Sequence, residues 1–101
     1  MLKAKVEIMF TKEGKTYEGD CRPAFNFGND LLFSGAVMSP VTEYLPKQKY
    51  IVDVAFFTIS SEGYEMVKSL LKPNMGMTMQ EGSRIIGVAK LLEYTYASEL
   101  A

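Results

Sequence analysis

The sequence predicts a mainly-β domain with one short helix, folded as a closed barrel or as a sandwich. Most of the chain alternates apolar and polar residues with a period of two, which is typical of strands that bury one face. Glycine and proline separate these segments at short intervals, as in barrels and sandwiches. Only the segment 61–71 has the spacing of an amphipathic helix.

Composition predicts a soluble domain without a strong electrostatic field. The 101 residues fit one domain over 1–97, followed by a C-terminal tail at 98–101. A net charge of −1 gives no general attraction to nucleic acid or to anionic membranes. With one cysteine, no signal-like start and no apolar run of about 18 residues, we expect a cytoplasmic protein without a membrane span.

Six segments carry the strand pattern, and each ends at a turn signal. In the first, apolar residues occupy every second position and mostly charged residues lie between them. The last two segments form a predicted hairpin, because Gly82 can adopt the positive φ that a tight turn needs. The predicted strands cover 2–10, 16–27, 31–39, 50–58, 75–80 and 84–96.

Glycine and proline also predict interruptions within strands. Pro23 cannot donate to a sheet ladder, so the second strand should kink near Gly19–Pro23. Gly35 is a candidate bulge or a point of close backbone approach. The last strand is apolar on both faces, which a bulge near Gly87–Lys90 would reconcile. The segment 40–49 is predicted as a loop.

The helix over 61–71 needs a docking surface, because an isolated helix of this length is marginal in water. Both faces of the 50–58 strand are apolar, so its outer face should be covered. We therefore expect the helix to pack on that strand, with Ile51 and Phe57 as its seat.

Four ordered stretches carry a family resemblance. They are 2–15, Arg22-Pro-Ala-Phe-Asn-Phe27, Leu45-Pro with the alternation that follows it, and Glu81-Gly-Ser-Arg-Ile-Ile-Gly87. Together they resemble the C-terminal β-barrel domain of elongation factor Tu and related translation factors, over about nine tenths of the chain. The resemblance implies a six-stranded antiparallel closed barrel, with the 61–71 helix as an insertion.

In that family the barrel helps to hold the T-stem of aminoacyl-tRNA and docks against a GTPase domain. By resemblance, Glu81 and Gly82 match hairpin positions that face the T-stem, and Ser34 matches a threonine and keeps its hydroxyl. Ala24 stands where the family has a glutamine, so that hydrogen bond is lost. The chain has no Gly-x-x-x-x-Gly-Lys-Ser/Thr phosphate loop, and we expect no GTP hydrolysis.

Two arginines complete the candidate binding residues. Arg84 has the chemistry to anchor a phosphate or a carboxylate, but the favoured interpretation is a strand-end arginine that pairs with Glu81 or with solvent. Arg22 is consistent either with a partner contact or with a brace for the kink at Pro23.

Other conspicuous side chains favour structural roles. Phe25 and Phe27 have rings suited to base stacking, but few lysines surround them, so core packing is favoured. The methionines at 75, 77 and 79 are interpreted as core and not as a soft-metal site, since the chain has no histidine. Cys21 likewise lacks a histidine partner and is interpreted as a half-buried thiol.

The sequence thus predicts a non-enzymatic binding module without metal or cofactor. We expect it to dock to a partner protein, or to a second copy of itself, through the face near the hairpin, the Arg22 strand and the helix. The alternative is tRNA or RNA binding through the remainder of the T-stem face.

Overall fold

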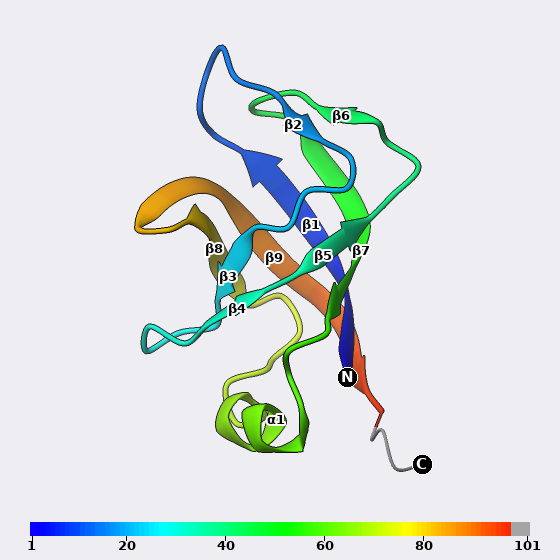
Figure 1. The fold of residues 1–101 in the computed structure, drawn as a ribbon, viewed down its shortest axis with the longest axis vertical. Coiled ribbons are helices and arrows are strands. Elements are labelled where there is room, and N and C mark those ends of the chain that lie inside the picture. Colours follow the sequence, from blue (N-terminus) through cyan, green and yellow to red (C-terminus); the bar gives the residue numbers. More distant parts are fainter. Residues whose placement is uncertain (98–101) are drawn as a thin grey trace.

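The computed structural model describes residues 1–97, so the predicted tail lies outside the described residues. A seven-stranded antiparallel sheet curls into a nearly closed barrel beside a two-stranded sheet (Figure 1). The predicted mainly-β barrel with one helix is confirmed. Its elements are β1 (Leu2–Phe10), β2 (Tyr17–Glu18), β3 (Ala24–Asn26), β4 (Leu32–Ser34), β5 (Ala36–Met38), β6 (Glu43–Tyr44), β7 (Lys49–Phe56), α1 (Ser61–Val67), β8 (Gly76–Glu81) and β9 (Arg84–Tyr96).

The barrel closes through one strand that is broken at Gly35. The strand order is β4-β3-β8-β9-β1-β7-β5, so the two edges of the sheet, β4 and β5, are consecutive in the chain. The segment 32–38 therefore pairs with β3 on one side and with β7 on the other. Gly35 N donates to Pro23 O at 3.0 Å and Val37 N donates to Cys21 O at 3.1 Å, which continues the ladder across the break. Counted as one strand, β4 and β5 complete a six-stranded barrel.

Gly35 lies where this closing strand crosses the core. A Cβ at this position would lie 2.5 Å from Val54 Cγ1, 2.8 Å from the ring of Phe25 and 2.9 Å from the ring of Phe56. The backbone comes closer to the core here than a side chain allows, which confirms the predicted point of close approach.

Side chains fill the barrel interior. The predicted core roles of Phe25, Phe27 and the methionines at 77 and 79 are confirmed, since all four are buried. No charged side chain of residues 1–97 is buried. The largest fully buried side chains are Tyr44, Phe10, Phe25, Phe56, Leu2, Ile8, Ile59, Met79, Ile86, Leu91, Val6 and Val54.

β9 changes its inward face at two irregularities. The shift against β8 leaves Ile86 as an extra residue, and the shift against β1 leaves Leu92. The expected bulge near Gly87–Lys90 is present at Ile86, next to Gly87, and a second irregularity follows at Leu92. Each extra residue reverses the alternation that follows it, so Ile86, Ala89 and Leu91 all reach the interior.

The segment 40–49, predicted as a loop, contains β6, which pairs with β2 at one end of the barrel (Figure 1). Tyr17 stacks on Phe10 with 4.2 Å between ring centroids, and Tyr44 packs edge-on against Tyr50 at 4.9 Å. This aromatic cluster closes that end of the barrel. A two-residue strand is too short for periodicity to reveal.

α1 covers the opposite end of the barrel and not the outer face of β7 (Figure 1). The predicted seat is wrong, because Ile51 and Phe57 are 64% and 55% exposed. A turn after β7 carries the chain past the end of the sheet before the helix begins. Tyr64 instead stacks on Tyr96 at 4.0 Å, and the helix ends earlier than expected, at the buried Val67. No helix within residues 1–97 has the length and apolar character to span a bilayer.

We expect Gly35→Ala to lower the free energy of unfolding by about 2–3 kcal/mol, because the added methyl group overpacks the core. Chemical denaturation followed by circular dichroism measures the change. Gly76→Ala is the matched control, since nothing lies within 4 Å of its added Cβ and it should cost no stability. Equal losses in both variants would show that Gly35 is not a packing constraint.

Candidate binding face

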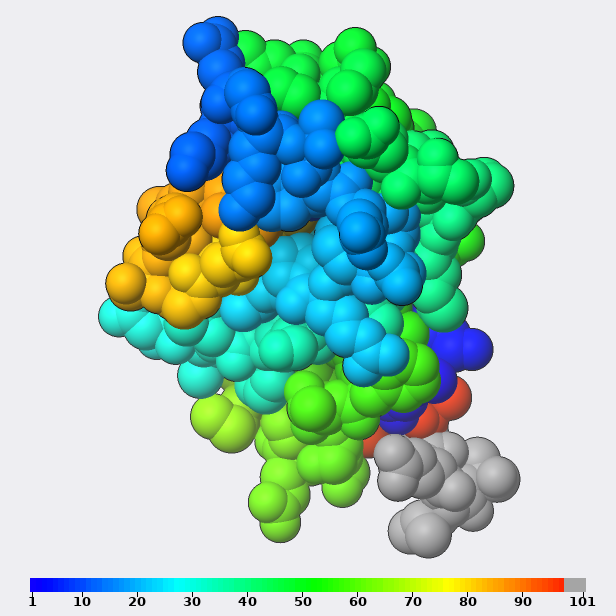
Figure 2. Space-filling view, turned by 45° about the horizontal axis from the view of Figure 1, so that its top comes forward, coloured from blue at the N-terminus to red at the C-terminus, as the bar shows by residue number. Residues whose placement is uncertain are grey.

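One part of the outer surface of the barrel is made of uncharged residues. It is built from outward positions of β4, β3 and β8 and from Ile85 and Val88 of β9, which are neighbours in the sheet. Exposed charges border it on β9, where Arg84 precedes Ile85 and Lys90 lies opposite Gly76. Cross-strand pairing aligns these positions in rows, so Ala24 lies between Ser34 on β4 and Gln80 on β8. In Figure 2 the cyan surface of β3 and β4 adjoins the yellow-to-orange surface of β8 and β9. We call it the uncharged face, and its residues are Ser34, Ala24, Gln80, Ile85, Leu32, Asn26, Thr78, Val88 and Gly76.

Three polar side chains of the uncharged face, those of Asn26, Thr78 and Gln80, are joined by hydrogen bonds. Gln80 Oε1 accepts from Thr78 Oγ1 at 3.3 Å and from Asn26 Nδ2 at 3.5 Å. Gln80 Nε2 donates to Gly82 O at 3.3 Å, and Asn26 Oδ1 accepts from Gly28 N at 2.9 Å. These bonds hold the side chains in place, so little further side-chain entropy is lost when a partner binds here.

Gly76 leaves a shallow groove across the uncharged face. Open space surrounds the position where its Cβ would lie. One groove runs from this point past Asn26 and Thr78, and another runs past Val88 toward Glu7 on β1. The face is therefore indented and offers a recess to a partner side chain.

The residues predicted from the sequence gather at one end of the uncharged face. Glu81, Gly82 and Arg84 form the β8–β9 turn, where Gly82 has a φ of 59°. Ser34 lies within the face itself, opposite Ala24 on β3. Arg22 is exposed, two residues before Ala24 on the strand that continues into β3. The structure thus brings the five predicted residues to one region of the barrel.

Arg84 is a solvent-exposed strand-end arginine, in agreement with the favoured interpretation, and Glu81 pairs with Lys15 Nζ at 3.5 Å. The expectation that the helix lies beside the hairpin is wrong, because α1 lies at the other end of the strands (Figure 1). Gly63 of α1 lies beside the ring of Phe33 on β4, and Leu70 in the turn after α1 lies close to Gly28.

The outer face across β9, β1 and β7 is charged by contrast. Lys5 lies in register between Glu93 on β9 and Asp53 on β7, and Lys5 Nζ is 3.5 Å from a Glu93 carboxylate oxygen. The exposed Ile51 lies opposite Glu7 on this charged face. The absence of charge is therefore a property of one face and not of the whole barrel.

Two side chains with nucleophilic chemistry, Cys21 and Tyr44, have raised pKa values. Within 1–97 no cluster of three or more acidic, cysteine or histidine side chains is placed to hold a metal. Burial raises the pKa of the half-buried Cys21 thiol to about 11, with smaller contributions from Asp20 and Glu81. Burial also raises the pKa of Tyr44. Both shifts disfavour the anion, which is the nucleophilic form.

In comparisons with known proteins, no family model and no curated protein matches the chain. The evidence for the candidate site therefore comes from its geometry in the structure. Reasoning from sequence found the hairpin end of the uncharged face but missed its centre, at Asn26, Thr78 and Val88. The available signal was a lack of charge at alternate positions of two distant segments, 24–34 and 76–88, which form one surface only when β3 pairs with β8.

We expect Cys21 to react slowly with iodoacetamide near pH 8, where its thiol with a pKa of about 11 is almost entirely protonated. The thiolate fraction should be about one in a thousand, against roughly a quarter for free cysteine. Alkylation in the folded protein should therefore be about a hundredfold slower than in urea, as measured by mass spectrometry. Equal rates in the two conditions would contradict the buried, neutral thiol.

Proposed function

We propose that the protein is a non-enzymatic binding module that docks a partner protein through the uncharged face. The observation that supports the proposal is a contiguous group of nine uncharged residues on the outside of β4, β3, β8 and the start of β9, in a chain that is 23% charged. Charged residues are depleted from the cores of protein–protein interfaces.

The chemistry of the uncharged face suits a protein surface. Ile85, Leu32 and Val88 are 58%, 42% and 42% exposed and supply apolar area. Between them Asn26 and Gln80 supply fixed amides that both donate and accept hydrogen bonds. Apolar area with positioned polar groups is the usual composition of a specific protein contact.

The resemblance to the C-terminal barrel of elongation factor Tu supports the same proposal, because that barrel works by docking and not by chemistry. On this proposal the chain is a docking barrel of that kind in the cytoplasm. Arg22, Ser34, Glu81, Gly82 and Arg84 then form the hairpin end of its docking surface.

RNA binding is the second candidate, and it is favoured only by the two exposed arginines, Arg22 and Arg84, near the hairpin. An RNA contact would show a log affinity that falls with log salt by about 0.7–0.9 per phosphate neutralised. No shift of tRNA mobility at low salt would remove this candidate.

We expect Ile85→Lys to weaken partner binding at least tenfold, because it places a charge that must be desolvated in the docking surface. The matched control is Ile51→Lys, which makes the same change at a similarly exposed strand position on the charged face. Affinity capture from the native cytosol, followed by titration with the captured protein, measures both variants. If the two lysines have the same effect, the uncharged face is not the docking surface.

A further inference from the structure

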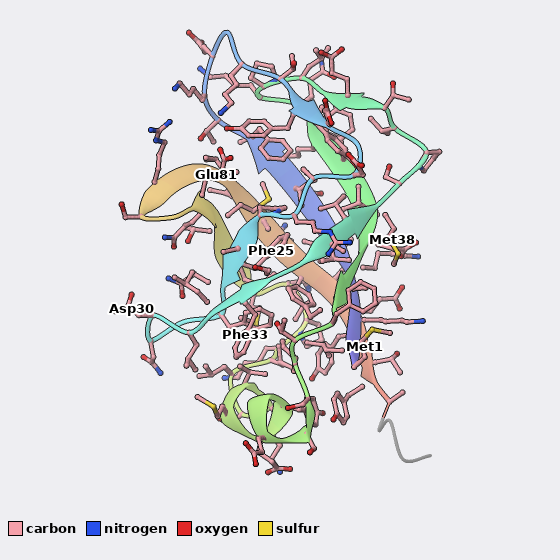
Figure 3. All side chains as sticks on the ribbon, viewed as in Figure 1. Met1, Phe25, Asp30, Phe33, Met38 and Glu81 are labelled. Atoms are coloured by element: carbon pink, nitrogen blue, oxygen red, sulfur yellow. The ribbon has the colours of Figure 1, made fainter. Side chains whose placement is uncertain are left out.

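We propose that the last part of β9 is a second docking site, where an extended segment of another protein adds to the sheet as a strand antiparallel to β9. The inference is carried by main-chain donors and acceptors of Tyr94 and Tyr96 that have no partner within residues 1–97. The site is separate from the uncharged face and its hairpin. Figure 3 shows Met1, which marks this end of the sheet, at the opposite end of the barrel from Glu81.

β9 is longer than the strand beside it. Its pairing with β8 ends where Lys90 lies opposite Gly76, and one further bond joins Leu91 N to Met75 O at 3.0 Å. Beyond this point only β1 continues beside β9, as far as Tyr96. In Figure 1, β9 runs on beside β1 past the beginning of β8.

The chain before β8 does not extend this pairing. Pro73 has no N–H to donate to a neighbouring strand. The chain also turns here, because Met75 N donates to Lys72 O at 3.1 Å. Among residues 1–97, no strand therefore fills the position beside the end of β9.

The pairing with β1 determines which main-chain groups of β9 point toward this open side. Met1 N donates to Ala97 O at 2.7 Å and Ala97 N donates to Met1 O at 3.1 Å, so the two residues form a hydrogen-bonded pair. In an antiparallel ladder such pairs alternate with pairs whose N–H and C=O groups point away. Tyr96 and Tyr94 are of the second kind, because the register runs without a break from Tyr96 to Glu93. Their N–H and C=O groups therefore point away from β1, and no group in 1–97 bonds to them.

This edge is held in place by its side chains. The ring of Tyr96 stacks on Tyr64 at 4.0 Å, and the Tyr94 hydroxyl donates to Leu71 O at 3.3 Å. These contacts with α1 and the turn after it use the side chains and leave the main chain of the edge unpaired. Buried N–H and C=O groups are almost always paired, so unpaired groups indicate an edge that water can reach.

The sequence of the edge does not protect it against pairing. Exposed edges commonly carry lysine or proline, which discourage a further strand. The stretch from Leu91 to Tyr96 has neither, and its threonine and tyrosines favour strands. The irregularity at Leu92 lies at its beginning, so 93–96 continues as a regular strand. Addition of a strand to such an edge is a common way for a protein to bind a peptide.

The side chains of the edge define the segment that fits it. Residues opposite Tyr94 and Tyr96 point to the side of these rings, so they should be apolar. The alternate residues lie outward, beside the exposed Glu93 and Thr95. The Glu93 side chain is 72% exposed and lies 3.5 Å from Lys5 Nζ, and its carboxylate can accept from a second cation. We therefore expect an alternating segment with a basic residue beside Glu93.

Hydrogen exchange measured by NMR tests the open edge in the free protein. The amides of Glu93 and Thr95 are bonded to β1 and should exchange at least about a hundredfold more slowly than those of Tyr94 and Tyr96. Equal protection of the four amides would show that the edge is already covered and would overturn the inference.

The probe for docking is a capped peptide, acetyl-Val-Thr-Val-Lys-Val-Thr-amide. It should protect the Tyr94 and Tyr96 amides with a Kd of roughly 0.1–1 mM, because few residues pair. Every strand pair of the sheet is antiparallel, and in this arrangement the valine amides point toward β9. N-methylation of the valine amides should abolish binding. N-methylation of the threonine and lysine amides is the matched control and should leave the Kd within about threefold.

A charge exchange tests the basic residue. Glu93→Lys should weaken binding of the peptide about fivefold, and a peptide with glutamate in place of lysine should restore it. Asp53→Lys changes a charge on the same cross-strand row, two strands from the edge, and should have no effect. Circular dichroism verifies that both variants fold.

The outcomes separate this inference from the proposed function. No protection of Tyr94 and Tyr96 by millimolar peptide overturns strand addition, as does an equal loss of binding with both methylated peptides. A loss with the control peptide alone overturns the antiparallel direction. Neither result bears on the uncharged face, which Ile85→Lys tests on another part of the barrel.

Discussion

The rest of the structure depends on the closure of the barrel by the single segment 32–38. This segment pairs with β3 and with β7, which would otherwise be the exposed edges of the sheet. It can reach both only because Gly35 has no side chain where the backbone crosses Val54 and Phe56. Closure in turn seals the interior, which large apolar side chains fill. Function is then left to the outer faces and the loops.

Closure also assembles the uncharged face. Residues around 24–34 and residues of the hairpin 76–88, which are far apart in the chain, become neighbours because β3 pairs with β8. The register shift in β9 at Ile86 is part of this assembly. It keeps both Ile85 and Val88 pointing outward although they are three residues apart, an interval that a regular strand would place on opposite faces.

The sequence pattern correctly predicted the features that depend on residues close together in the chain. Alternation gave the long strands and the methionine core, Gly35 marked a close approach that only glycine allows, and Gly82 marked a turn with positive φ. The pattern gave wrong predictions for features that depend on contacts between residues far apart in the chain. Ile51 and Phe57 are apolar but exposed, since the helix that should cover them is carried past the barrel end. The uncharged face escaped detection for the same reason, because its register is set by pairings between strands that are not consecutive.

The charge difference between the outer faces has no explanation in the folding of the barrel. Outward positions on β1 and on β8 occupy the same kind of environment, half-exposed on the convex side of one continuous sheet. On β1 they include Lys3, Lys5 and Glu7, whereas on β8 they are Gly76, Thr78 and Gln80. A lysine at an exposed strand position costs little stability and protects against aggregation. Charges would therefore be tolerated on β8, and their absence there favours a surface that spends part of its time covered.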